Sequence, residues 1–77
     1  MIESTTDAMK ILKTAANCCA DEDYLRPPEV DAALDYLASL SARKDLIERF
    51  RRKLNVSHPL ARQSSVRAAY EALEREI

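Results

Sequence analysis

The sequence predicts an all-α protein, a small bundle of about four short helices in a single domain that spans residues 1–77. Three observations lead to this class. The chain contains no glycine, and only 5% of its residues are aromatic. Its apolar residues recur at the three- and four-residue intervals of amphipathic helices. An all-β fold is disfavoured, because hairpin turns rely on glycine and strands favour aromatic side chains.

The first predicted helix runs from about residue 6 to residue 20. Ser4, Thr5 and Thr6 offer side-chain oxygens for an N-cap, and Asp7 suits the positive end of the helix dipole. The apolar stripe of this helix consists of Met9, Leu12, Ala16 and Cys19, with Ala8, Ile11 and Ala15 beside it.

Residues 21–28 interrupt the helical pattern, because each proline pushes the residue before it towards an extended conformation. Pro28 then suits the first turn of a second helix, where Glu29 and Asp31 occupy favoured acidic positions. The predicted buried face of this helix is Val30, Ala33, Leu34, Leu37 and Leu40.

Residues 28–54 fit either one long helix or two shorter ones, because the apolar stripe continues through Ile47, Phe50 and Leu54. We favour a break near residues 39–41, where Ser41 can act as an N-cap. The last helix follows a clearer boundary. We expect Asn55 to end the preceding helix in a left-handed conformation, and Ser57 or His58 to cap a helix that has Pro59 in its first turn. The predicted face of that last helix is Val66, Ala69, Tyr70, Leu73 and Ile77.

Several function classes are excluded or disfavoured by composition. Glycine-rich phosphate loops are excluded, since they need backbone that only glycine allows. Cys18 and Cys19 are adjacent and are the only cysteines, so neither a disulfide framework nor a zinc-binding spacing is available. We interpret them as small apolar side chains in a reducing compartment, and we expect a cytoplasmic protein with no membrane span.

No catalytic, cofactor-binding or metal-binding residues are predicted, and we expect a protein that is not an enzyme and has no cofactor. His58 is the only histidine, and a capping or exposed imidazole is the simpler interpretation of its place beside Pro59. Asp31 and Asp35 lie one helical turn apart, a spacing that allows a cation between them. Two carboxylates at this spacing more commonly point into water.

Charge is divided unevenly along the chain. The balance is −5 for residues 1–42, +6 for residues 43–67 and −2 for the remainder. Favourable i, i+4 pairs are predicted for Asp45/Arg49, Glu48/Arg52, Arg67/Glu71 and Glu71/Arg75. These predicted pairs do not include Arg43, Lys44, Arg51, Lys53 or Arg62. The simplest explanation of this basic segment is a helix face that is exposed to solvent. The functional explanation is a face that binds a partner.

We therefore predict a small, non-enzymatic protein-protein interaction or regulatory module that binds a macromolecular partner through its helix faces. The alternative is a nucleic-acid-binding regulator with a helix-turn-helix-like segment around residues 43–76, in which Arg62, Gln63, Ser64 and Arg67 occupy the exposed first turns of the recognition helix. A homodimer remains open, because 12 alanines and a single phenylalanine make a thin core. The candidate binding residues are Arg43, Lys44, Arg51, Arg52, Lys53, Arg62, Gln63 and Arg67.

Residues 64–77, Ser-Ser-Val-Arg-Ala-Ala-Tyr-Glu-Ala-Leu-Glu-Arg-Glu-Ile, resemble the end of the recognition helix in GntR-type winged-helix repressors. The preceding turn lacks the glycine usual in that family, and the chain ends where the wing is expected. Residues 45–50 resemble part of the second helix of acyl carrier proteins, but the Asp-Ser-Leu attachment motif of those carriers is missing. Neither resemblance assigns the chain to a family.

Overall fold

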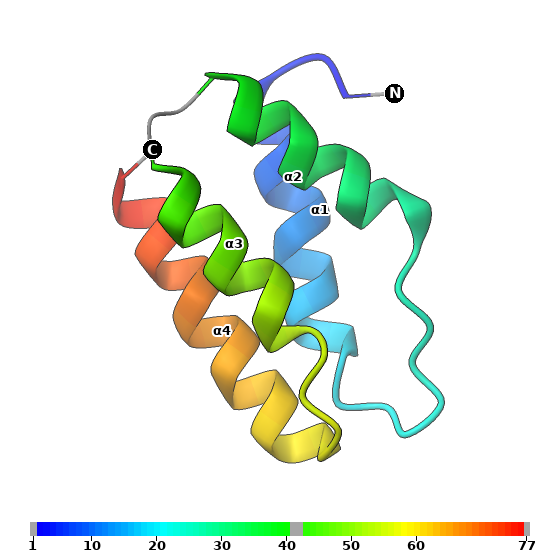
Figure 1. Ribbon diagram of the computed structural model, residues 1–77. Coiled ribbons are helices and arrows are strands. Elements are labelled where there is room, and N and C mark those ends of the chain that lie inside the picture. The colour runs from blue at the N-terminus through cyan, green and yellow to red at the C-terminus, as the bar shows by residue number, and fades with distance from the viewer. Residues whose placement is uncertain (1, 41–42, 77) are drawn as a thin grey trace.

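The computed structural model describes residues 2–40 and 43–76. This part of the chain contains four helices, α1 (Thr5–Cys18), α2 (Pro28–Leu40), α3 (Lys44–Lys53) and α4 (Pro59–Glu76), and no strand. The predicted all-α class is therefore confirmed. Each helix runs back along the one before it (Figure 1). Helix α1 packs against α2 and α4, and α3 packs against the same two helices.

Helix α1 begins as predicted, with Ser4 as its N-cap. The Ser4 Oγ accepts a hydrogen bond from the Asp7 N–H at 3.2 Å, while the Asp7 carboxylate accepts one from the Glu3 N–H at 3.3 Å. These bonds satisfy amide groups that a helix start otherwise leaves unpaired. The helix ends at Cys18, two residues earlier than the expected end, with Cys19 as its C-cap.

Helix α2 begins at Pro28, and four of the five residues predicted for its buried face are buried (Val30, Ala33, Leu34 and Leu37). The burial predicted for Leu40 is wrong, because 63% of its surface is exposed. A step of three residues turns a helix through about 300°, so Leu40 lies roughly 60° around the axis from Leu37. It is also the last residue of the helix.

The preference for two helices in residues 28–54 is confirmed, since α2 ends at Leu40 and α3 begins at Lys44. The predicted N-cap, Ser41, lies outside the described residues. The N-cap position of α3 is occupied by Arg43. Its guanidinium bonds to Asp45 in the first turn, and its Nη1 donates to Glu76 of α4 at 2.7 Å.

The left-handed conformation expected for Asn55 is wrong: no described non-glycine residue has a positive φ. Helix α3 ends instead in a tightened turn, in which the Asn55 N–H donates to the Arg52 carbonyl at 3.0 Å. Bonds of this i to i+3 type satisfy terminal carbonyls without a left-handed residue. The expected cap of the last helix is confirmed, since His58 Nδ1 accepts at 3.3 Å from the N–H of Ala61, the third residue of the helix that starts at Pro59.

The core lies between the four helices and contains the aliphatic stripes that the sequence predicts. Its largest fully buried side chains include Phe50, Leu12, Leu34, Leu37, Leu73 and Val66. On the predicted face of α4, Tyr70 is only partly buried, and Ile77 lies outside the described residues. Among the described helices, none is long and apolar enough to cross a bilayer.

Candidate interaction surfaces

Arg62, predicted to be an exposed binding residue, is buried, with 9% of its surface exposed. Its Nε donates to the Cys19 carbonyl at 2.6 Å, its Nη2 to the Asp21 carbonyl at 2.7 Å, and its Nη1 to the Val56 carbonyl at 3.1 Å. The exposure expected for this side chain is therefore wrong. The N–H donors of the planar guanidinium thus connect the start of α4 to the end of α1, to the loop between α1 and α2, and to the loop between α3 and α4.

The sequence contains a signal for this burial. Arg62 lies four residues before Val66, seven before Ala69 and eleven before Leu73, so it continues the buried stripe of α4 by one turn. A basic side chain on an apolar stripe needs acceptors, and the chain provides them as loop carbonyls more than forty residues away along the sequence.

Gln63 and Arg67 also bond within the bundle. Gln63 Nε2 donates to the Asn17 carbonyl at 3.1 Å, and Arg67 Nη2 donates to the Asn17 side-chain oxygen at 3.3 Å. Both side chains therefore lie against the last turn of α1. Three residues that the helix-turn-helix interpretation assigns to base contacts thus contact α1 or the loop that follows it.

Arg51 connects α3 to α2. Its Nη1 lies 3.2 Å from Asp31 and its Nη2 lies 3.1 Å from Asp35, and Arg26 approaches Asp31 at 3.6 Å. The two carboxylates do not simply point into water, because a guanidinium lies between them as their cation. The side chain of Arg51 is 30% exposed and therefore half-buried, and it links two helices that otherwise contact each other little.

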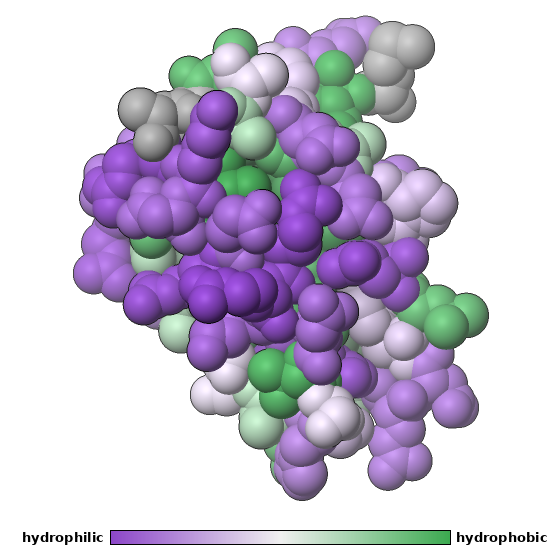
Figure 2. Space-filling view, in the orientation of Figure 1, coloured by the Kyte–Doolittle hydropathy of each residue, from purple (hydrophilic) through white to green (hydrophobic). Residues whose placement is uncertain are grey.

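The remaining cations of α3 form the basic surface, which we define as Lys44, Arg49, Arg52 and Lys53. Within residues 2–40 and 43–76, none of the four has an ion-pair partner. Lys44, Arg49 and Arg52 are exposed, and Lys53 is half-buried. Figure 2 shows strongly hydrophilic side chains across the face of the molecule where α3 lies.

Arg49 belongs to this surface although it is absent from the predicted binding residues. The sequence pairs it with Asp45, but Asp45 bonds to Arg43 instead, at 3.3 Å. This bond holds the pKa of the Asp45 carboxyl below its usual value. None of the four predicted i, i+4 ion pairs forms between the described residues. Arg75, for example, donates to the Glu71 carbonyl and not to its carboxylate.

The aromatic ring of Tyr24 lies beside the guanidinium of Arg62. The Arg62 Cζ lies 5.7 Å from the centre of the Tyr24 ring, a cation–π distance. The Tyr24 hydroxyl is buried and has no hydrogen-bond partner among the described residues. Burial raises the pKa of this phenol above its usual value, with smaller contributions from the neighbouring Cys19 and Cys18. The hydroxyl therefore remains a neutral donor at physiological pH.

The two cysteines are both free thiols, but they differ in exposure. Cys18 is exposed, while Cys19 is buried, and burial raises the pKa of the Cys19 thiol. We expect a disulfide reagent at pH 8 to modify Cys18 at least about tenfold faster than Cys19, because the thiolate is the nucleophile and Cys19 reacts only when the chain opens. Absorbance of the released thiol measures both phases. A fast phase that persists in Cys18→Ser would contradict this assignment.

His58 lies at the start of α4. Its Nδ1 is the acceptor of the α4 cap. In the described part of the chain, no group of three or more His, Cys, Asp or Glu side chains is placed to hold a metal ion. The comparisons with known proteins give no match, either to a protein-family model, to a curated protein or to a solved structure.

Proposed function

We propose that the protein is a non-enzymatic interaction module that binds an acidic surface of a partner protein through the basic surface of α3. The observation that carries this proposal is the set of four cations without described partners, Lys44, Arg49, Arg52 and Lys53. Exposed charges of one sign steer a partner of opposite sign and raise the association rate.

The dimensions of α3 indicate that the contact extends beyond this helix. Its ten residues span about 15 Å, whereas a typical stable interface buries about 800 Å² on each partner. The whole chain exposes 4945 Å², so such an interface would cover roughly a sixth of it. The contact would therefore include parts of α4 or α2, with α3 at its centre.

A protein partner is favoured over duplex nucleic acid by the bonds inside the bundle. Three of the four side chains expected at a DNA groove, Arg62, Gln63 and Arg67, bond to groups of this chain. The acidic balance of residues 1–42 would also repel a phosphate backbone. Titration of generic duplex DNA at about 50 and 200 mM salt tests the nucleic-acid alternative. Binding that weakens steeply with salt would favour nucleic acid over the protein partner.

Charge reversal tests the basic surface directly. We expect Arg49→Glu/Arg52→Glu to reduce capture of the partner from nuclease-treated native lysate by about tenfold, because two attractive contacts become repulsive. Capture is measured as the partner-to-bait ratio by quantitative mass spectrometry.

The matched control is Lys10→Glu/Lys13→Glu, which makes the same change of net charge at two exposed positions of α1. We expect this control to capture the partner almost as well as the unmodified chain. Equal losses in the two variants would contradict a role for α3, because net charge alone would then explain the result.

A further inference from the structure

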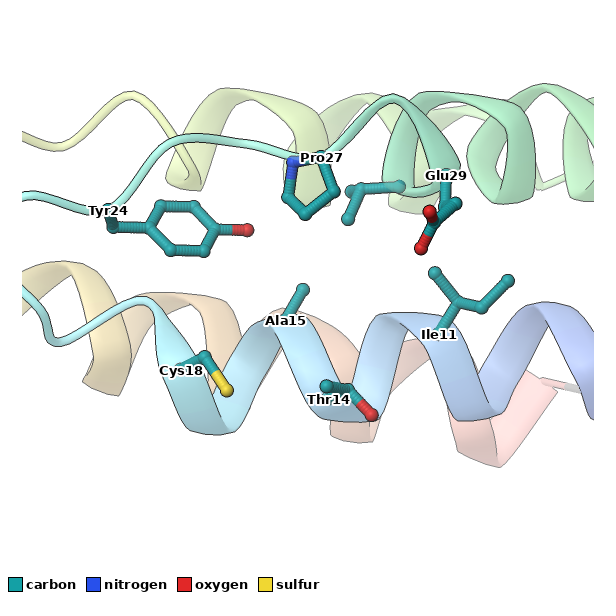
Figure 3. Close-up of a pocket in the computed structure, with 8 residues that line it drawn as sticks. Ile11, Thr14, Ala15, Cys18, Tyr24, Pro27 and Glu29 are labelled. Carbon is teal, nitrogen blue, oxygen red and sulfur yellow. The ribbon is translucent and has the colours of Figure 1, made fainter.

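The outer side of the α1–α2 pair is hollowed by two neighbouring pockets. The first pocket, of about 210 Å³, lies between α1 and the loop that leads into α2 (Figure 3). The second, of about 450 Å³, has Ile2 and Tyr36 among its lining residues. Both are lined by Ile11 and Glu29. We call these two neighbouring pockets together the α1–α2 groove.

Neither α3 nor α4 fills the groove. Ile11, Thr14, Ala15 and Cys18 follow the i, i+3, i+4, i+7 spacing and therefore share one side of α1. Asn17 lies on a different side, where it bonds to Gln63 and Arg67 of α4. The groove side of α1 is thus turned away from α4, and α1 does not pack against α3.

The chemistry of the groove is apolar with an acidic edge. Its floor and walls include Ile11, Ala15, Val30 and Ala32. Its two charged lining residues are both acidic, Glu29 and Asp35. Glu29 is exposed and has no ion-pair partner within the described residues. Asp35 offers only Oδ1 to Arg51, and its side chain is 75% exposed, so it can accept a second cation.

Tyr24 provides a polar group at one end of the groove. Figure 3 shows its ring lying along the first pocket, with the hydroxyl directed towards the middle and Ala15 and Ile11 approaching from α1. This hydroxyl is buried and has no described partner. Leaving a buried donor unpaired is costly, so a bound group that offers an acceptor here would be favoured.

We infer that the α1–α2 groove binds an amphipathic helix of a partner protein whose apolar side is flanked by lysine or arginine. An amphipathic helix lying in a groove between two helices is a common recognition mode, and the bundle offers no sheet edge for a strand in its described part. The acidic groove edge and the −5 balance of residues 1–42 complement a basic helix. Helix α1 has 14 residues, so a ligand helix of similar length, about 21 Å, would cover the groove.

A second copy of this chain is the poorer occupant. The large exposed apolar residues of the described chain are Leu25 in the loop before α2, Leu40 at the end of α2 and Leu60 in the first turn of α4. They form no apolar stripe that one helix could place in the groove. Because the groove lies on α1 and α2, this inference is independent of the basic surface of α3.

The experiment uses a fluorescein-labelled, 14-residue peptide with leucine at i, i+3, i+4 and i+7 and lysine on both flanks, and it measures anisotropy. We expect saturable one-to-one binding to the full chain. The matched peptide with glutamate in place of lysine is expected to bind at least about tenfold more weakly.

Four variants of the protein locate the site, each checked for folding by circular dichroism. Ile11→Glu places a charge in the apolar centre and is expected to weaken binding by about fiftyfold or more. Glu29→Gln is expected to weaken it about fivefold and to reduce its salt dependence, and Tyr24→Phe, which removes only the hydroxyl, about two- to tenfold. Leu60→Glu changes an exposed leucine outside the groove, and we expect no effect from it.

Three results would overturn the inference: equal affinity for the two peptides, full binding by folded Ile11→Glu, or a dimer in sedimentation that Ile11→Glu dissociates. The last result would assign the groove to a second copy. None of them affects the capture experiment with Arg49→Glu/Arg52→Glu, so failure of the groove and failure of the basic surface are distinguishable.

Discussion

Replacement of Arg62 with methionine is expected to lower the free energy of unfolding by about 2–4 kcal/mol. The side chain donates to the carbonyls of Cys19, Asp21 and Val56, and hydrogen bonds from a charged donor contribute about 1.5–3 kcal/mol each. The cost of removing the guanidinium from water offsets part of this sum. For a domain of this length, such a loss lowers the melting temperature by roughly 10–30 °C.

Two further variants make the comparison specific. Arg62→Lys keeps the charge but loses the planar fork, and we expect it to lose about half as much stability. Arg67→Met removes a single exposed contact with Asn17 and is expected to change stability by no more than about 0.5 kcal/mol. Urea unfolding followed by circular dichroism measures all three. If Arg62→Met and Arg67→Met unfold at the same urea concentration, Arg62 does not hold the bundle together.

Phe50→Ala is expected to have the largest effect, a loss of about 3–5 kcal/mol. Phe50 is the only phenylalanine of the chain and is fully buried on α3. Much of the remaining core is alanine, and backbones brought close by alanine cannot collapse into a cavity of this size. Marginal domains of about this length have only about 4–12 kcal/mol of stability in total, so the variant is expected to lose a large share of it.

The matched control is Leu40→Ala, which truncates a leucine that is 63% exposed. We expect a change within about 0.5 kcal/mol, because little apolar surface is lost from the interior. Scanning calorimetry of both variants checks the prediction. Equal losses for Phe50→Ala and Leu40→Ala would show that the described core is not the one that stabilises the protein.

Local signals predicted the helices well. The Ser4 and His58 caps and the prolines at 28 and 59 act on neighbouring backbone, so their effects can be predicted from nearby residues. The conformation of Asn55 at the end of α3 was predicted incorrectly, because turn hydrogen bonds from Asn55 and its neighbours replaced the expected left-handed residue. Leu40 was misplaced because a periodic stripe does not show where a helix stops packing.

The candidate binding residues were predicted less well, because their partners are distant in sequence. Arg51 bonds to Asp31 and Asp35 on another helix, and Arg62 bonds to loop carbonyls. A count of charges along the sequence does not distinguish these bonded side chains from Arg52, which has no partner among the described residues. The groove beside Tyr24 is likewise formed by segments that only the tertiary fold brings together.

The central claim is that the basic segment has two parts, one that holds the bundle together and one that faces outward to bind. Exchange of arginine Nε–H protons with solvent, measured by NMR on the unmodified chain, tests it most directly. We expect the Arg62 proton, bonded at 2.6 Å to the Cys19 carbonyl, to exchange at least about a hundredfold more slowly than those of Arg49 and Arg52. Equal exchange rates for the three side chains would contradict the division and with it the proposed role of α3.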